Sequence, residues 1–322
     1  MKTFLIRLTI FGVAILILAT IIDLMVSQGL RHTPKNHLET MNIVMHDKPQ
    51  NDVLILGTSR GANAYDTHIL DSILDCNSRN LSVSGKAFRI NNLRYQAYRR
   101  NNSAPKLIIV DIDHIELGEG TLGFENYMFY PYMMDTLVKP ILKMNHFNWL
   151  DCHIPMYRYR GDYKYISLGL CELFNIYHLK GRGQKGFTPN QNGTFAGEKL
   201  RNEIKNHPNG IDVGCDSAVI DIFSSFLAQT KAENVQVVMV YSPLYYLVQN
   251  NLSTKWSTLM HIYDSLGIQY DVPILNYQKF DMNKDSIYFN DGNHLNLRGA
   301  EFFTTQLARD IDSLHLYSKS DK

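Results

Sequence analysis

The feature that most constrains this chain is a run of nineteen mostly apolar residues near its N-terminus, from Leu8 to Val26. At about 1.5 Å of rise per residue, a helix of that length nearly matches the roughly 30 Å hydrocarbon core of a bilayer. A helix that is apolar on every side does not suit the surface of a polar domain. We therefore expect residues 1–27 to form one membrane-spanning helix. The run is interrupted only by Thr9, Gly12, Thr20 and Asp23.

The flanks of this run indicate how the helix would lie in a membrane. No clear small-x-small cleavage motif lies near Ala19 or Ser27, which favours a retained signal anchor over a cleaved signal peptide. Lys2 and Arg7 favour a cytoplasmic N-terminus, although Arg31 and Lys35 on the other side weaken the charge asymmetry. We expect a single-pass protein of the cytoplasmic membrane whose body lies on the extracytoplasmic side, periplasmic or extracellular.

The composition argues against several classes of protein. Of 322 residues, 32 are Lys or Arg and 31 are Asp or Glu, so the net charge of +1 provides no general attraction for nucleic acid. The cysteines lack the C-x-x-C spacing of zinc or redox centres, and His153 and His178 have no partners at metal-ligand spacing. We expect no metal, no cofactor and no nucleic-acid partner. The cysteines are Cys76, Cys152, Cys171 and Cys215, of which Cys152 and Cys171 are candidates for a disulfide.

Short apolar runs alternate with helical patterns along the body of the chain. The run 106–113 is almost continuously apolar, which is typical of a strand covered on both faces. Alternation of this kind predicts a three-layer α/β/α domain with a parallel sheet. We expect this domain at residues 52–322, after a polar tether at 28–51 that shows no clear periodicity. The expected strands are 53–56, 80–83, 106–113, 235–241 and 272–275, and the expected helices are 90–100, 216–230, 253–266 and 296–314.

An insert of about a hundred residues, about 114–214, interrupts this alternation. It is too long for a simple crossover, so it indicates a lid or a subdomain. Its first half is rich in aromatic residues, from Phe124 to Tyr165, which would either form the insert's own core or line an acyl or sugar pocket. Its second half, 181–214, is rich in Gly and Pro and predicts loops.

Two short motifs carry candidate chemistry. The first is Gly57-Thr58-Ser59-Arg60, where the first strand ends and a helix begins. A serine there lies at the ligand-binding edge of a parallel sheet, with backbone N–H groups near its hydroxyl. A serine at a helix start is also a common N-cap, so this motif alone leaves both interpretations open.

The second motif is Asp291-Gly292-Asn293-His294, just before the last helix. An aspartate three residues before a histidine can accept a hydrogen bond from Nδ1 and leave Nε2 free to take a proton from a serine. The alternative is an Asp-Gly turn that leads into a helix cap. In each motif the catalytic interpretation gains weight from the presence of the other.

Together, the two motifs resemble the SGNH or GDSL hydrolase superfamily, which places its serine after the first strand and its D-x-x-H before the last helix. The resemblance covers roughly residues 52–113 and 216–315 and implies a flavodoxin-like hydrolase fold. It implies Ser59 as nucleophile, Asp291 and His294 as its triad partners, and an oxyanion hole formed by the N–H groups of Ser59 and Gly85. The GTSR form looks similar to the membrane-anchored branch related to alginate O-acetylation and teichoic-acid D-alanylation proteins.

One family block departs from this pattern. At the end of the third strand, Asp113 stands where the family carries an asparagine that donates to the oxyanion, and an ionised carboxylate cannot donate. Asp113 would contact substrate or act as a structural carboxylate paired with Arg60 or a backbone N–H. Arg60 would contact an anionic substrate group or form a structural ion pair, and Tyr241 would line the cleft after the fourth strand.

The resemblance implies a serine esterase or O-acyltransferase that acts, through an acyl-serine intermediate, on acyl groups of cell-envelope or extracellular polysaccharide. The substrate would be an acylated carbohydrate or another envelope ester, and a membrane O-acyltransferase is a candidate partner. The alternative from another class is a non-catalytic SGNH-like accessory subunit of a membrane acyltransferase system. The acyl group, the acceptor and the oligomeric state have no signal in the sequence.

Overall fold

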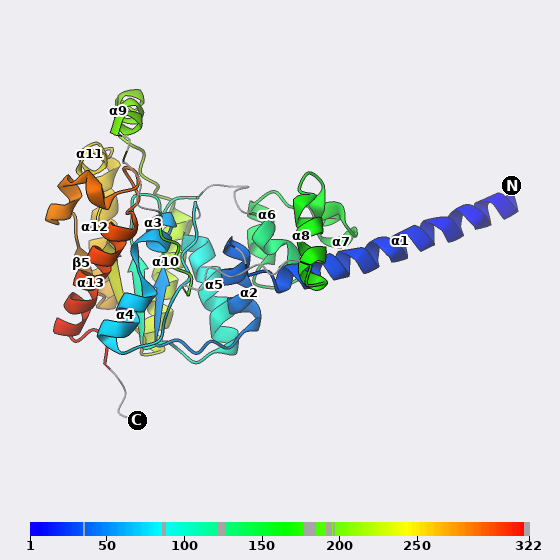
Figure 1. Cartoon of the computed structure of the whole chain (residues 1–322), viewed down its shortest axis with the longest axis horizontal. Coiled ribbons are helices and arrows are strands. Elements are labelled where there is room, and N and C mark those ends of the chain that lie inside the picture. Colours follow the sequence, from blue (N-terminus) through cyan, green and yellow to red (C-terminus); the bar gives the residue numbers. More distant parts are fainter. Residues whose placement is uncertain are drawn as a thin grey trace. The chain divides into compact units, whose positions relative to one another are not determined.

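The computed structural model describes residues 1–34, 36–85, 88–120, 126–176, 185–190, 195 and 197–318. Two compact units make up the chain (Figure 1). The N-terminal unit combines Met1–Asp47 with Leu122–Arg182, and the sheet unit combines Lys48–Thr121 with Gly183–Lys322. Only the middle part of the expected insert therefore belongs to the unit that carries the apolar N-terminal helix.

The sheet unit contains five parallel strands in the order β2-β1-β3-β4-β5. All five lie in or next to the expected ranges. The second is shorter than expected and ends at Asn80, although the N–H groups of Leu81 and Val83 still donate to the carbonyls of Ile55 and Gly57 at 2.8 Å. The chain thus follows β1 past the end of β2. The strands are β1 (Val53–Leu56), β2 (Ser78–Asn80), β3 (Leu107–Asp111), β4 (Gln236–Tyr241) and β5 (Ile274–Asn276).

Helices cover the sheet in two groups. The crossover from β1 to β2 runs in the opposite direction along the sheet to the later ones, and right-handed crossovers place such helices on opposite faces. One group is α3 (Ser59–Ala64), α4 (Thr67–Leu74) and α13 (Leu297–Ser313), and the other is α5 (Phe88–Asn101), α10 (Ser217–Ala232) and α12 (Lys255–Tyr270). This is the expected three-layer α/β/α architecture. The direction reverses between β1 and β3, and parallel sheets bind ligands at such a point.

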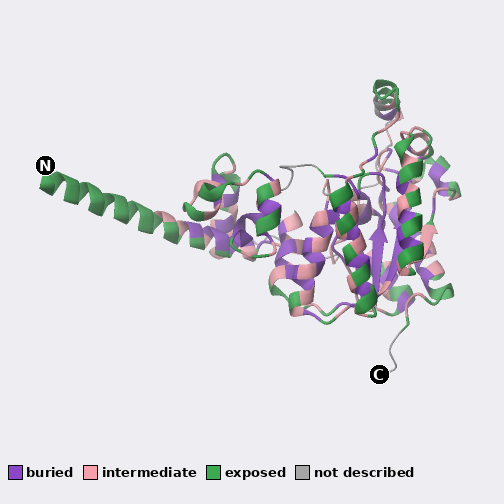
Figure 2. Cartoon of the chain, turned by 180° about the vertical axis from the view of Figure 1, so that it is seen from behind, coloured by how far each residue is buried: buried purple, intermediate pink, exposed green. Residues whose placement is uncertain are grey.

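Burial follows the apolar runs in the sequence. Every residue of β1 and β3 is buried, because helices cover both faces of these strands, and Figure 2 shows the buried strands between partly exposed helices. On the α5 and α10 side, the ring of Phe88 packs edge-on against Phe223 and Phe226 at centroid distances of 4.6 and 5.1 Å. The remaining short elements are α9 (Gly197–Asn206), α11 (Tyr246–Gln249), η3 (Asp281–Lys284) and η4 (Ser286–Tyr288).

The N-terminal unit is helical in its described residues. It contains α1 (Lys2–Arg31), α2 (Asn36–His46), η1 (Asn126–Tyr132), α6 (Lys139–Met144), α7 (Trp149–His153), η2 (Tyr157–Tyr159) and α8 (Lys164–Leu173). The end of α1 crosses α8 closely: a Cβ added to Gly29 would lie 1.7 Å from the carbonyl oxygen of Gly169. Only a residue without a side chain permits this approach.

The aromatic residues of the insert form a core within this unit. Phe129, Tyr130, Tyr132, Tyr159 and Tyr165 are buried, and the Tyr130 ring meets those of Tyr159 and Tyr165 edge-on at 5.3 and 5.9 Å. The structure therefore favours the interpretation that they form the insert's own core. Phe124 and His178 lie outside the described residues.

The sequence interpretation of residues 28–51 needs correction. The segment contains the end of α1 and the helix α2, whose residues Leu38, Met41 and Val44 are fully or almost fully buried. Their spacing of three places them along one side of the helix, a periodicity that the short polar segment obscured. The cysteines are all free, so Cys152 and Cys171 do not form a disulfide.

Candidate active site

The turn that carries Ser59 is built between β1 and α3. Thr58 is the N-cap of α3, and its Oγ1 accepts a hydrogen bond from the N–H of Arg60 at 3.3 Å. Gly57 is needed because a Cβ at this position would lie 2.8 Å from the Cβ of Asp111 on β3. The backbone thus packs tightly against β3 and presents Ser59 at the first residue of the helix.

Ser59, His294 and Asp291 form a continuous hydrogen-bonded chain. The Oγ of Ser59 lies 2.7 Å from Nε2 of His294. Nδ1 of His294 lies 2.9 and 3.0 Å from Oδ1 and Oδ2 of Asp291. The structure therefore brings together the three residues that the two sequence motifs singled out, although 235 positions separate Ser59 from His294. This arrangement orients a base and a nucleophile for proton transfer.

The turn of Asp291 and His294 is closed by its own hydrogen bonds. Oδ1 of Asp291 accepts the N–H groups of Asn293 and His294 at 2.8 and 3.0 Å. An antiparallel bridge between Phe289 and Leu295 flanks the turn. Burial would raise the pKa of Asp291, but the hydrogen bonds from His294 and Asn293 outweigh it and lower this pKa below its ordinary value. Asp291 is therefore a carboxylate at neutral pH.

Solvent reaches this part of the site. The side chain of His294 is 25 % exposed and that of Asp291 is 50 % exposed, while Ser59 is half-buried. Among the described residues, neither the N–H of Ser59 nor that of Gly85 donates a hydrogen bond. Gly85 has φ +66°, a left-handed conformation that glycine adopts without strain.

Asp113 is a buried structural carboxylate in this structure. Its side chain is fully buried, with Oδ2 accepting the Thr58 hydroxyl at 2.5 Å and Oδ1 accepting the N–H groups of Ile115 and Glu116 at 2.7 Å. These bonds join the turn after β3 to the residue before Ser59. Of the two alternatives for Asp113, the structure favours the structural one.

Arg60 also points into the protein. It is 3 % exposed, and its guanidinium donates to the carbonyl and hydroxyl of Ser242 at 2.7 and 2.8 Å and to the carbonyl of Asn293 at 3.4 Å. It stacks 5.4 Å from the ring of Tyr241, which is fully buried. Arg60 therefore connects the turn of Ser59 with the turn of His294, and the side chains of both Arg60 and Tyr241 are buried within the protein.

Asn91, Glu116 and His114 lie behind the site in the protein interior, and sequence reasoning did not assign them to it. The side-chain amide of Asn91 donates to the carbonyl of Gly57 and to Glu116 Oε1, each at 2.9 Å. Burial, and then Asp113, raises the pKa of Glu116 well above its ordinary value. Burial is the largest cause that lowers the pKa of His114; Asp113 opposes it, and Arg60 and His294 add to it. No local signal marks these residues, because their roles depend on contacts between distant segments.

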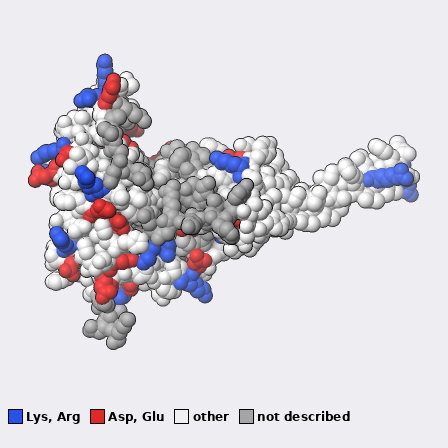
Figure 3. Space-filling view, viewed as in Figure 1, with Lys and Arg blue, Asp and Glu red and all other residues white. Residues whose placement is uncertain are grey.

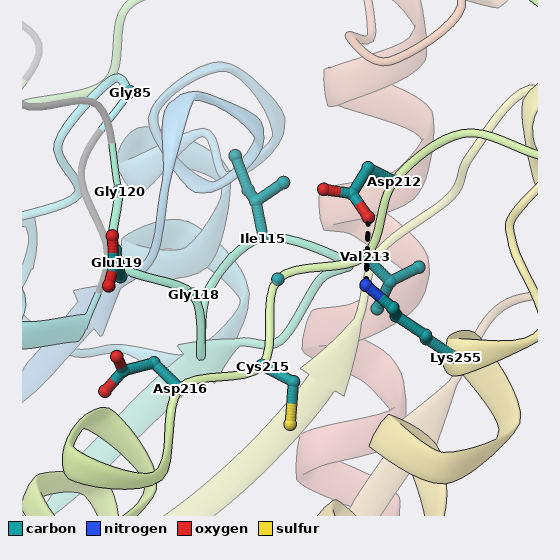
Figure 4. A pocket seen from close by; sticks show the side chains of 11 residues that line it. Gly85, Ile115, Gly118, Glu119, Gly120, Asp212, Val213, Cys215, Asp216 and Lys255 are labelled. Carbon is teal, nitrogen blue, oxygen red and sulfur yellow. Dashed lines mark ion pairs between the residues drawn. The ribbon is translucent and has the colours of Figure 1, made fainter. Parts of the chain in front are cut away.

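A cavity of about 560 Å³ lies beside Gly85 (Figure 4). Its walls come from the turn after β3 and from the segment that precedes α10. Glu119, Asp212, Asp216 and Lys255 line it, and Lys255 pairs with Asp212 at 3.6 Å. The cavity combines charged side chains with apolar and backbone groups, and its size is typical of small-molecule sites.

No protein-family model and no curated protein matches the sequence. Similar solved structures include a GDSL-like lipase from Bacteroides thetaiotaomicron, with 10 % identity, TM-score 0.36, and 80 % of this chain and 87 % of that chain covered. Another is a family two carbohydrate esterase from Clostridium thermocellum in complex with cellohexaose, with 6 % identity, TM-score 0.40, and 84 % and 67 % covered.

Proposed function

We propose that this protein is a serine hydrolase or acyltransferase that cleaves ester bonds through an acyl-serine intermediate. The observation that carries the proposal is the 2.7 Å separation between Ser59 Oγ and His294 Nε2, with His294 Nδ1 held by Asp291. An isolated helix-capping serine has no need of such a partner. The pair therefore favours an enzyme over a non-catalytic accessory subunit.

Ser59, His294 and Asp291 each have a distinct role in the proposed reaction. Ser59 Oγ attacks the ester carbonyl carbon while its proton moves to His294 Nε2. The bond to the leaving alcohol then breaks, and that alcohol takes the proton from Nε2. Water or an acceptor hydroxyl next attacks the acyl-serine, gives its proton to Nε2, and releases Ser59, which takes the proton back. Asp291 stabilises the imidazolium throughout.

The negative charge that develops on the carbonyl oxygen requires donors. We assign this role to the N–H groups of Ser59 and Gly85, which donate to no described residue. The Asp113 side chain takes no part, because it accepts three hydrogen bonds from protein groups. Loss of one oxyanion donor typically costs about 100-fold to 1000-fold in rate, so we expect slow hydrolysis or transfer to a bound acceptor.

The cavity beside Gly85 offers charged side chains and backbone groups that can form hydrogen bonds with a carbohydrate, although none of the three triad residues lines it. An acylated envelope or extracellular polysaccharide fits this chemistry. Cooperation with a membrane O-acyltransferase stays a prediction.

We further propose that α1 is retained as a membrane anchor. The helix is long and apolar enough to cross a membrane. Its last turns belong to the N-terminal unit, since Val26 and Leu30 are fully buried there and Gly29 contacts Gly169. Cleavage as a signal peptide would remove part of that core.

The enzyme proposal is tested by labelling the purified full-length protein with a fluorophosphonate probe, followed by peptide mapping. We expect the probe on Ser59 and no labelling of Ser59→Ala. Ser265→Ala on α12 is the matched control and should label like the wild type. A folded wild-type protein that leaves Ser59 unlabelled would disprove the acyl-serine mechanism.

A further inference from the structure

The free part of α1 presents an apolar surface that no other described residue covers. Ile10, Phe11 and Leu24 are each at least 63 % exposed, and Figure 2 shows this part of the helix as exposed. Figure 3 shows basic side chains at its N-terminal end and an uncharged surface beyond them. No ionisable residue lies between Arg7 and Asp23. A bilayer is the environment that matches such a helix.

Asp23 marks the level at which α1 enters the folded N-terminal unit. Its carboxylate forms an ion pair with Arg158, the middle residue of η2. The same carboxylate accepts a hydrogen bond from the N–H of Met156 at 3.0 Å. Both charged side chains are largely buried, at 10 % and 11 % exposure. Because a partner neutralises it within the protein, the aspartate does not oppose insertion of the preceding residues. The bilayer surface therefore lies close to Asp23.

A short helix exposes three large apolar side chains near this level. Trp149, Leu150 and Ile154 are 63 %, 40 % and 39 % exposed, and together we call them the α7 patch. Tryptophan with aliphatic neighbours is typical of residues at a membrane–water interface, where the ring lies among the headgroups.

The α7 patch is tied to Asp23 by short connections. Asp151 of α7 forms an ion pair with Arg160, which directly follows η2. Ile154 lies two residues before Met156, whose N–H donates to Asp23. In Figure 1, α7 is drawn beside α8 and toward the free part of α1. These connections hold the patch at the end of the apolar run.

We propose that the α7 patch inserts into the interfacial layer of the bilayer that α1 spans. The occupant is lipid rather than a protein, because the patch belongs to the same compact unit as α1 and is linked to Asp23 at the end of the apolar run through the segment around η2. Two membrane contacts, one spanning and one interfacial, would fix the tilt of the N-terminal unit, which one helix alone does not. This proposal rests on α1 as an anchor and is independent of the esterase chemistry.

Tryptophan fluorescence in vesicles tests the proposal. The chain has two tryptophans, Trp149 and Trp256, so Trp256→Phe leaves the patch residue as sole reporter and Trp149→Phe leaves one in the sheet unit. The full-length variants are reconstituted in vesicles of phosphatidylcholine and phosphatidylglycerol with a nitroxide near the glycerol backbone or near the chain end. We expect Trp149 to be quenched at least about threefold more than Trp256, and more by the shallow nitroxide than by the deep one.

A paired variant separates lipid contact from mere proximity. In the Trp256→Phe background, Leu150→Glu with Ile154→Glu should reduce the shallow quenching to near the level of Trp256, whereas Ile268→Glu, at an 85 % exposed site in the sheet unit, should not. Carbonate extraction of the same vesicles reports on α1 separately. If carbonate releases the chain from the vesicles, α1 does not span the bilayer, and the proposal that rests on this anchor is overturned. If the chain stays in the membrane after carbonate extraction but Trp149 is quenched no more than Trp256, the α7 patch does not contact lipid. That outcome would overturn the proposal and favour a protein partner for the patch.

Discussion

The two turns that meet in the candidate active site are supported in different ways. The turn of Ser59 rests on buried groups from distant parts of the chain, including Asp113 and Asn91. The turn of Asp291 and His294 closes mainly on itself and is partly exposed. Changes to the buried groups that support the Ser59 turn should therefore alter both folding and activity, whereas changes in the second turn should alter mainly activity.

The largest effect should come from Ser59→Ala. Removing the nucleophile should lower kcat/KM for a short-chain aryl ester by about 10⁴-fold or more, because no acyl-enzyme forms. The Tm should stay close to that of the wild type, since His294 is the only partner of the Ser59 hydroxyl among the described residues. A large fall in Tm would mean that the hydroxyl has a structural role and would weaken the comparison.

Asp291→Asn should have the next largest effect. The amide retains an oxygen for the N–H groups of Asn293 and His294 but no longer stabilises the imidazolium, so kcat should fall by about 10³-fold to 10⁴-fold. Circular dichroism should be unchanged, and Tm at neutral pH should fall only by the small stabilisation that the lowered pKa of Asp291 represents. Activity within about tenfold of the wild type would contradict the assigned triad.

Asp113→Ala should affect folding most directly. It removes the acceptor of the Thr58 hydroxyl and of two backbone N–H groups, and leaves the buried Arg60 without its nearest carboxylate, 4.0 Å away. We expect a loss of about 3 to 5 kcal/mol in the free energy of unfolding, measured by urea denaturation. Asp113→Asn keeps an acceptor and should lose less. Equal stability of all three proteins would show that this network does not support the turn.

The smallest effect should be the pH dependence that Asp111 causes. Burial raises the pKa of Asp111 to about 6, with Arg60 opposing. Because the folded pKa is above the ordinary value of 3.8, the stabilisation is complete below that value and is lost as pH rises toward 6. The loss is at most about 3 kcal/mol. Asp111→Asn should remove this slope from a plot of unfolding free energy between pH 4 and 6.

The pH dependence of stability that Asp291 causes should have the opposite sign. Its pKa is lowered, so its contribution to stability is present above pH 3.8 and is lost only as pH falls below that value. Comparing the Asp111→Asn and Asp291→Asn plots tests whether the two turns differ as the structure indicates. Identical slopes in both variants would remove that difference.

Much of the sheet unit was predictable because its signals are local. Continuous apolar runs gave the positions of β1, β3 and β4 within a few residues, and the motif order placed Ser59 and His294 at the right elements. The predicted position of the short edge strand β2 was less accurate, since few apolar residues define this strand. The prediction of a polar tether at residues 28–51 was wrong because the buried face of α2 consists of a few residues within a polar segment.

The roles of Arg60, Asp113 and Tyr241 were open in the sequence for a different reason. A polar residue near a motif looks the same whether it faces substrate or protein. The structure distinguishes the two, because Arg60 reaches Ser242 and Asn293, far along the chain. Asn91 and Glu116 were missed altogether, since neither lies in a recognisable motif.

Local chemistry was thus enough to indicate an apolar N-terminal helix, a parallel sheet and three residues suited to one catalytic arrangement. Folding settled the rest: that Ser59 and His294 lie 2.7 Å apart, that an aromatic insert packs with the end of α1, and that candidate substrate residues are buried. The physical reason is that periodicity and turn chemistry depend on neighbours in sequence. Burial, charge pairing and the distance between side chains depend on segments that only folding brings together.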